Sequence, residues 1–143
     1  MSRRMKSSSV GLLSFIVLSL AVIVATSPSH AFEITIQVSP STLNIQSSGE
    51  VVTIHTSIAY SSVVGATVTL NNVPISWWKA DNQGNFVAKF VMSEVKTLAN
   101  TGDLQVPGEN ELTLVGTTTD GATFTGTQTI TVINIQPAGA GGK

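Results

Sequence analysis

The sequence predicts an all-β domain: two packed sheets of about seven to eight antiparallel strands, with one short helical turn. Of the 112 residues from Phe32 to Lys143, 39 are Thr, Val or Ile, which suit a pleated, half-buried surface better than a helix. Short runs of these residues are separated by Gly, Pro, Asn and Asp, a pattern typical of a sandwich or barrel. The expected strands are Glu33–Val38, Thr42–Ile45, Glu50–Ile58, Ala66–Leu70, Ile75–Ala80, Asn85–Val91, Glu111–Thr118 and Ala122–Ile133.

The first 31 residues have the three-part order of a secretory signal peptide. Three cations in the first six residues precede an uncharged run from Val10 to Ala25, and Ser29-His30-Ala31 suits cleavage before Phe32. The run is short for a membrane span, which needs about 20 apolar residues, although an uncleaved anchor is the alternative. We therefore expect residues 1–31 to be removed and the remainder to be secreted or periplasmic, without membrane insertion.

The remaining chain is expected to be one domain, residues 32–135, followed by a flexible Gly-rich tail, residues 136–143. From Phe32 onward it holds four lysines and eight carboxylates, a net charge of about −4 that the whole-chain value of −1 conceals. An acidic chain without a basic cluster argues against nucleic acid and against anionic lipid. The absence of Cys from the sequence excludes disulfides and thiolate metal sites.

Three local features refine the strand prediction. Ser39-Pro40 separates the first two strands, which fits an edge strand that switches sheets. Alternate residues from Val52 to Ile58 share one face of the third strand, with His55 on the other. A helical turn over Ser93–Leu98, with Ser93 as its N-cap, is expected to bridge the two sheets.

The register of the last hairpin follows from its hydrophobic pattern. A two-residue Asp120-Gly121 turn would place Leu112 and Leu114 on a polar face. A three-residue loop, Thr119–Gly121, with Gly121 in the left-handed conformation, corrects this. The inner pairs are then Gly116 with Phe124, Leu114 with Gly126 and Leu112 with Gln128, and the outer pairs are Thr117 with Thr123, Val115 with Thr125 and Thr113 with Thr127.

The hairpin over residues 77–90 is predicted in the same way. A loop of Asn82–Gly84 places Trp78 opposite Ala88, on the face that also carries Phe86 and Phe90. We therefore expect Trp78 to be the core tryptophan. Trp77 would lie on the outer face, opposite Lys89 and exposed.

Nearly all of the region from Ser39 to Ile133 resembles the bacterial immunoglobulin-like (fibronectin-III-like) accessory modules of exported, often multidomain proteins. The resemblance implies an immunoglobulin-like sandwich acting as a spacer, an adhesive unit or a carbohydrate-associated domain. We expect one module without an attached catalytic domain, which differs from the usual setting. The segments that carry the resemblance are Ser39-Pro40-Ser41-Thr42-Leu43-Asn44-Ile45, Ala66-Thr67-Val68-Thr69-Leu70-Asn71, Asn85-Phe86-Val87-Ala88-Lys89-Phe90, Pro107-Gly108-Glu109-Asn110-Glu111-Leu112-Thr113-Leu114, Asp120-Gly121-Ala122-Thr123-Phe124-Thr125-Gly126-Thr127 and Thr129-Ile130-Thr131-Val132.

The candidate ligand-binding residues are Trp77, Lys89 and Tyr60. An exposed tryptophan offers a face for a sugar ring, and Lys89 could stack on it or bond a hydroxyl. Tyr60 could flank the same region. In the alternative interpretation, Lys89 only covers a surface aromatic, or Trp77 packs under the Ser61–Gly65 loop.

Other polar features have structural explanations. His55, the only histidine after residue 31, lacks the neighbours from which acid–base and metal sites are built. Asp81–Asn85 resembles a calcium loop only faintly and is explained by turn chemistry. The alternate threonines from Thr123 to Thr131 fit the solvated face of a strand. We expect no catalytic residue, metal or cofactor.

These observations favour a non-catalytic module for structural or adhesive protein–protein interaction at the cell envelope or outside the cell. Its partner would be an exported or envelope protein. The first alternative is a small polysaccharide-binding protein that uses Trp77. The second is a filament subunit assembled by strand exchange.

Overall fold

The computed structural model describes residues 31–136. The predicted signal peptide, apart from Ala31, and tail residues 137–143 lie outside the described residues. The described range holds ten strands, one 3₁₀ turn and one helix. These are β1 (Ala31–Glu33), β2 (Ile36–Ser39), β3 (Thr42–Asn44), β4 (Val51–Ala59), η2 (Tyr60–Ser62), β5 (Val63–Leu70), β6 (Val73–Pro74), β7 (Trp77–Ala80), β8 (Asn85–Val91), α2 (Met92–Asn100), β9 (Gly108–Thr118) and β10 (Thr123–Ile133).

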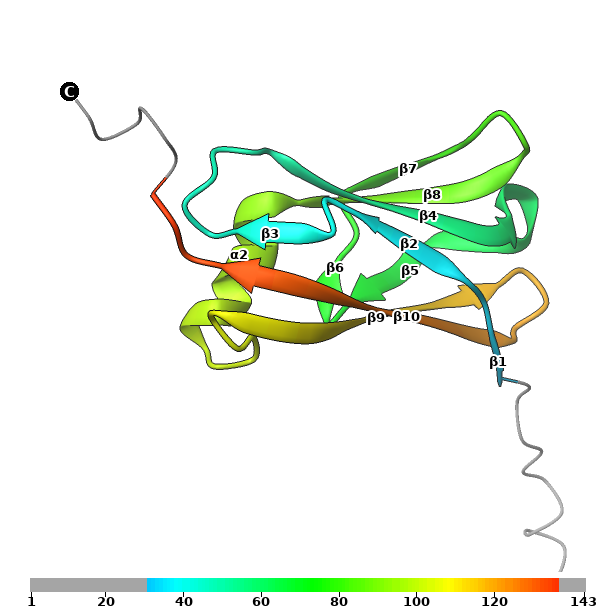
Figure 1. Ribbon diagram of the computed structural model, residues 1–143. Helices are drawn as coiled ribbons and strands as arrows, with labels where there is room; N and C mark the ends of the chain where they lie inside the picture. The colour runs from blue at the N-terminus through cyan, green and yellow to red at the C-terminus, as the bar shows by residue number, and fades with distance from the viewer. Residues whose placement is uncertain (1–30, 137–143) are drawn as a thin grey trace, which may run out of the picture.

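The strands form two sheets that face each other (Figure 1). The four-stranded sheet has the order β2-β4-β8-β7, and the six-stranded sheet has the order β1-β10-β9-β5-β6, with β3 also paired to β10. The predicted all-β class, with two sheets and one short helix, is confirmed. The predicted count of seven to eight strands is too low for residues 31–136, and antiparallel pairing is not universal, because β1 and β3 run parallel to β10.

The N-terminal segment accounts for one of the two strands beyond the eight expected ranges, and the other is β6. The expected strand Glu33–Val38 is divided: the Ile34 N–H still donates to the Thr125 carbonyl of β10 (2.9 Å), whereas the Thr35 carbonyl accepts from Ser57 of β4 (3.0 Å). The chain returns to the six-stranded sheet after Pro40. The prediction of an edge strand that switches sheets at Pro40 is therefore confirmed.

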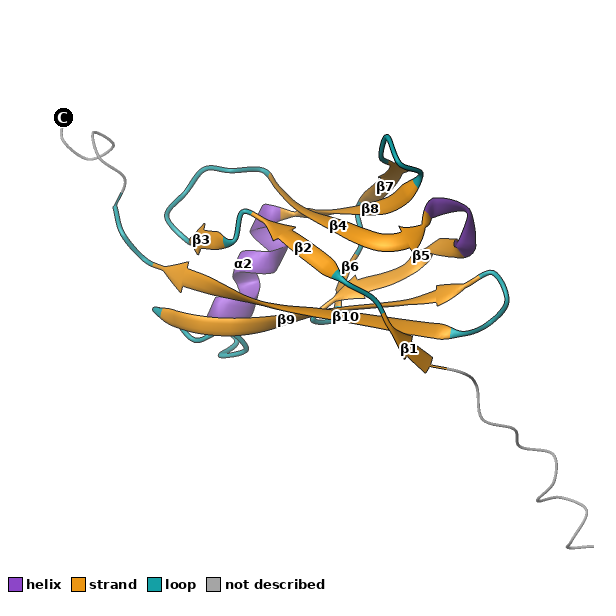
Figure 2. Ribbon diagram, turned by 45° about the vertical axis from the view of Figure 1, so that its right-hand side comes forward, coloured by secondary structure: helices purple, strands orange, loops and turns teal. Residues whose placement is uncertain are grey.

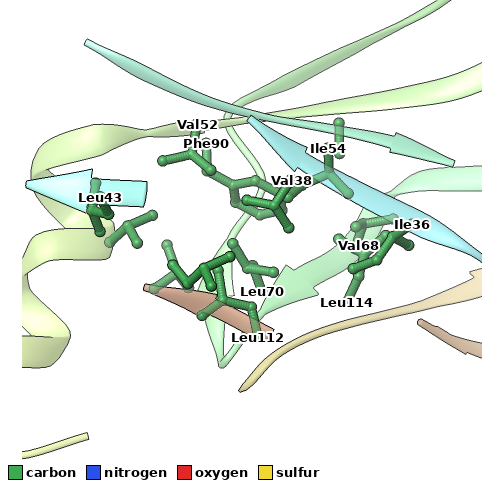
Figure 3. Packing of buried hydrophobic residues seen from close by; sticks show 14 of the residues in the cluster. Ile36, Val38, Leu43, Val52, Ile54, Val68, Leu70, Phe90, Leu112 and Leu114 are labelled. Atoms are coloured by element: carbon green, nitrogen blue, oxygen red, sulfur yellow. The ribbon is translucent and has the colours of Figure 1, made fainter. Parts of the chain in front are cut away.

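The core lies between the two sheets. Its largest fully buried side chains are Phe86, Phe90 and Phe124, and Figure 3 shows aliphatic side chains from both sheets converging in the same space. Alternate residues from Val52 to Ile58 are buried and His55 is exposed, as predicted. The one polar member of that buried set, Thr56, donates its hydroxyl to the Phe86 carbonyl (2.6 Å), which satisfies a group that would be costly to bury alone.

The helix connects β8 of one sheet to β9 of the other and stands at one end of the two layers (Figure 2). It therefore bridges the sheets as expected, burying Met92, Val95 and Leu98. It is longer than predicted, and the N-cap assignment is wrong. Val91 occupies the N-cap position and makes no side-chain capping bond. The β4–β8 pairing extends to the start of the helix, where the backbone N–H of Met92 donates to the Glu50 carbonyl (2.9 Å). Within residues 31–136 no helix has the length and apolar character to cross a membrane.

Both predicted hairpin registers are confirmed. All six cross-strand pairs expected in β9–β10 are present, and β7–β8 pairs Trp77 with Lys89 and Trp78 with Ala88. The expected left-handed glycines, Gly84 and Gly121, have φ of 82° and 90°.

Candidate binding surface

Strand β7 is the edge of the four-stranded sheet, and all four of its residues are exposed. It carries both tryptophans of the chain. Because neighbouring residues of a strand point to opposite faces, Trp77 faces outward and Trp78 faces toward the other sheet. Their exposed fractions are 48% and 36%. The edge therefore presents a large aromatic ring on each side.

Trp77 belongs to a row that crosses the outer face of its sheet. The register aligns Ser39, Thr53, Lys89 and Trp77 from β2 through β4 and β8 to β7. The Lys89 Nζ lies 5.2 Å from the centre of the Trp77 ring and donates to the Thr53 hydroxyl (3.1 Å). The ammonium group is thus held over the ring in a cation–π arrangement. Thr53 also belongs to this group, and the local sequence pattern of the β7–β8 hairpin does not indicate it.

The next row along the outer face aligns Gln37, His55, Val87 and Lys79. Val87 is fully buried there although it points away from the core, so the side chains around it cover it. The outer face of this sheet therefore carries Lys79, Lys89 and His55 beside one exposed tryptophan. Among the described residues, no three His, Cys, Asp or Glu side chains are grouped as a metal site would require.

Trp78 is not the core tryptophan, and that prediction is wrong. The indole lies instead over Gly65 of β5 in the opposite sheet, where a Cβ would come within 2.2 Å of the ring. Because β7 is an edge strand, its inward side chain closes the open side between the sheets rather than entering the core. Trp78, and not Trp77, therefore contacts the 61–65 segment, at Gly65.

Tyr60 lies away from the Trp77 row. Its ring stacks on Phe86, with centroids 6.2 Å apart, and its backbone N–H donates to the Gly84 carbonyl (2.8 Å). Phe86 is buried on the inner face, whereas Trp77 and Lys89 are on the outer face. Tyr60 is 40% exposed, but the structure does not bring it together with the other two candidate residues.

Asp81 closes the β7–β8 turn. Its carboxylate accepts the backbone N–H groups of Gln83 (2.8 Å) and Asn85 (2.9 Å). The Asn85 bond is the main cause of a lowered Asp81 pKa; desolvation opposes it, while Gln83, the charge of His55 and Gly84 lower the pKa further. These bonds occupy the carboxylate as turn chemistry predicts.

The outer face of the six-stranded sheet has a different character. The threonines from Thr123 to Thr131 alternate along β10 as expected, and cross-strand partners on β9 extend the polar array at Thr113 and Thr117. Glu109 and Glu111 stand opposite the last two threonines of the row. This face is therefore hydroxyl-rich and acidic, whereas the opposite outer face carries lysines and Trp77.

No protein-family model matches the chain, and neither the curated proteins nor the solved structures compared with it include a match.

Proposed function

We propose that this chain is an exported, non-catalytic immunoglobulin-like module that binds other proteins at the cell envelope or outside the cell. The strand order supports the immunoglobulin-like assignment. The order β2-β4-β8-β7 corresponds to strands A, B, E and D of that fold, and β10-β9-β5 corresponds to strands G, F and C. The division of the first strand between the sheets is compatible with this arrangement.

The observation that carries the binding role is the exposed tryptophan strand β7. An edge strand presents backbone N–H and C=O groups to a partner, and extended segments are recognised by strand addition to such edges. Aromatic residues are enriched at protein interfaces and often supply most of their binding energy. Two tryptophans on the two faces of one open edge combine both features.

A photo-cross-linking amino acid at position 77 tests this role in cells that export the full chain. We expect a discrete protein adduct after irradiation, because a partner on β7 would contact this side chain. The matched control places the same amino acid at Thr127, on the outer face of the six-stranded sheet. The proposal fails if position 77 gives no discrete adduct or gives the same adducts as position 127.

A polysaccharide ligand is the second candidate, favoured by the Trp77–Lys89–Thr53 group. An exposed indole offers an apolar face for a sugar ring, and the ammonium and hydroxyl groups beside it offer hydrogen bonds. A glycan and polysaccharide array with the purified domain tests this. Trp77→Ala should abolish binding and Thr127→Ala should retain it. Absence of binding by the wild type, or equal binding by Trp77→Ala, would reject this candidate.

A further inference from the structure

We propose that β7 pairs with β7 of a second copy of this chain, antiparallel, with the two-fold axis at Trp78. The inference rests on the proposed protein-binding role and names its partner. In such an isologous contact the same strand serves on both sides, and the two four-stranded sheets join through their edges. In Figure 1, β7 lies at the margin of its sheet, with β8 as its neighbour.

The direction of the backbone groups is compatible with this pairing. The Asp81 N–H donates to the Asn85 carbonyl of the adjoining strand (2.9 Å). Since backbone groups alternate in direction along an antiparallel strand, Lys79 and Trp77 also direct theirs toward β8. The alternation ends at Ser76, whose N–H also donates to β8, at the Lys89 carbonyl (2.9 Å). The N–H and C=O groups of Trp78 and Ala80 are then directed at the open edge. Two copies can therefore exchange two hydrogen bonds between their Trp78 residues.

The side chains are complementary in the same register. Pairing centred on Trp78 places Trp77 of each copy opposite Lys79 of the other, and both side chains are on the outer face. This repeats the relationship that Trp77 already has with Lys89, whose Nζ lies 5.2 Å from the ring centre. The indole would then lie between two ammonium groups, one from each copy, and cation–π contacts are stronger when they are shielded from water.

On the inner face, the two Trp78 rings would lie beside each other, each against Gly65 of its own chain. Trp78 is 36% exposed in the single chain, so pairing would bury part of this surface. Contact between two aromatic rings adds to the free energy gained from that burial.

The neighbouring registers are less favourable. Sliding one strand by a single residue would place inward side chains opposite outward ones, and a two-fold axis at Lys79 would set the two Lys79 ammonium groups opposite each other, where like charges are unfavourable. A shift centred on Ala80 would pair Trp78 with Asn82, which already belongs to the turn.

A lysine on an edge strand often prevents pairing. In the proposed dimer Lys79 would face the Trp77 ring of the second copy. Substituting Lys79 therefore shows whether this lysine promotes pairing or prevents it. Lys79→Glu places a carboxylate over the second copy's Trp77, and we expect dimer affinity to fall at least about tenfold. Lys79→Arg should retain the affinity. If Lys79→Glu leaves dimerisation unchanged or strengthens it, the inference fails.

The main measurement is sedimentation equilibrium of the purified domain from micromolar to millimolar concentration. We expect a concentration-dependent monomer–dimer equilibrium that Ala80→Pro abolishes. Proline at this position replaces the N–H directed at the open edge with ring carbons that would collide with the second copy's strand, and it removes no N–H directed at β8, so circular dichroism of this variant should match the wild type. A monomer at all concentrations, or a dimer that persists in a folded Ala80→Pro variant, would overturn the inference.

Because the sequence contains no cysteine, single-cysteine variants test the register directly. Trp78→Cys should form a disulfide-linked dimer on oxidation, since the paired Cα atoms would be about 5.5 Å apart. Ala80→Cys should not, and cross-linking by this variant would show a different register. A monomeric domain that still forms adducts at position 77 with another protein would overturn this inference alone, whereas no adduct and no dimer would overturn the proposed function as well.

Discussion

The hairpins β7–β8 and β9–β10 use the same turn but differ in what surrounds them. In each, the residue before a three-residue loop donates its N–H to the residue after the loop, at 2.9 Å for Asp81 and 2.8 Å for Thr118. In each, a left-handed glycine donates back to that first residue at 3.0 Å. Strands β9 and β10 both have neighbours on either side, whereas β7 is an edge.

The difference shows that turn and pattern determine register locally, whereas burial depends on the opposite sheet. The same reasoning assigned Phe124 and Trp78 to the inner faces of their hairpins. Phe124 is fully buried and Trp78 is 36% exposed. The register of both hairpins can therefore be predicted from their own residues, but how far each side chain is buried cannot.

The largest expected difference between the hairpins concerns these two aromatic side chains. Phe124→Ala should lower the free energy of unfolding by about 4 kcal/mol, because it leaves a cavity in a closed core. Trp78→Ala should cost about 2 kcal/mol, because water already reaches part of its ring. Urea denaturation of both variants measures the difference, and equal costs would contradict the view of β7 as an open edge.

Two glycines beneath these rings give a smaller effect of the same kind. A Cβ at Gly116 would lie 2.4 Å from the Phe124 ring and 2.8 Å from Val68, which are both buried, so Gly116→Ala should cost about 2 kcal/mol. A Cβ at Gly65 would lie even closer to Trp78, at 2.2 Å. That ring can turn outward into solvent, so Gly65→Ala should cost less than about 1 kcal/mol.

Tryptophan fluorescence distinguishes the two responses. In a Trp77→Phe background, Trp78 is the only indole of the domain. Gly65→Ala should then shift the emission to longer wavelength, while Gly116→Ala should leave it in place. An unchanged emission with a large loss of stability in Gly65→Ala would show that Trp78 is held as firmly as Phe124.

The same distinction between local and long-range information explains which other features could be predicted. The alternation along β4 and the sheet switch at Pro40 follow from local pattern, and the structure has both. The division at Ile34–Thr35 depends on hydrogen bonds to Thr125 and Ser57, which are distant in the sequence. The helix start likewise depends on Glu50, which accepts the Met92 N–H.

For the candidate surface, Trp77 and Lys89 could be placed together because they are cross-strand partners in one hairpin. Thr53 joins them only through the pairing of β4 with β8. Tyr60 could not be placed from sequence, because the η2 turn that stacks it on Phe86 has no periodic signal.

The next prediction concerns the left-handed glycine that each of the two turns contains. Gly84 and Gly121 have positive φ, and a Cβ at either would meet nothing within 4 Å. Substitution by Ala should therefore cost about 1 kcal/mol at each position, from backbone strain alone. Urea denaturation should give matching losses for the two variants. Clearly unequal losses would show that the turns differ in more than their surroundings.

The smallest expected effect is a pH dependence present in only one hairpin. Hydrogen bonds, chiefly from the Asn85 N–H, hold the pKa of Asp81 below its ordinary value of 3.8. A lowered carboxyl pKa means that the folded state favours the ionised form, so the stabilisation is complete above the ordinary pKa and is lost as the pH falls through the folded value. Asp81→Asn keeps an acceptor but not the charge. The wild type should therefore be slightly more stable than this variant at neutral pH, and the difference should disappear in acid.

Thermal unfolding of the two proteins between about pH 6 and pH 3 measures this difference. Thr118→Val is the matched control, because Thr118 holds the equivalent position through its hydroxyl, which bonds the Ala122 N–H at 3.0 Å and does not titrate in this range. Its stability deficit should stay constant with pH. A deficit for Asp81→Asn that persists unchanged in acid would show that the Asp81 charge contributes nothing to the β7–β8 turn, and that the two turns are equivalent in electrostatics as well as in geometry.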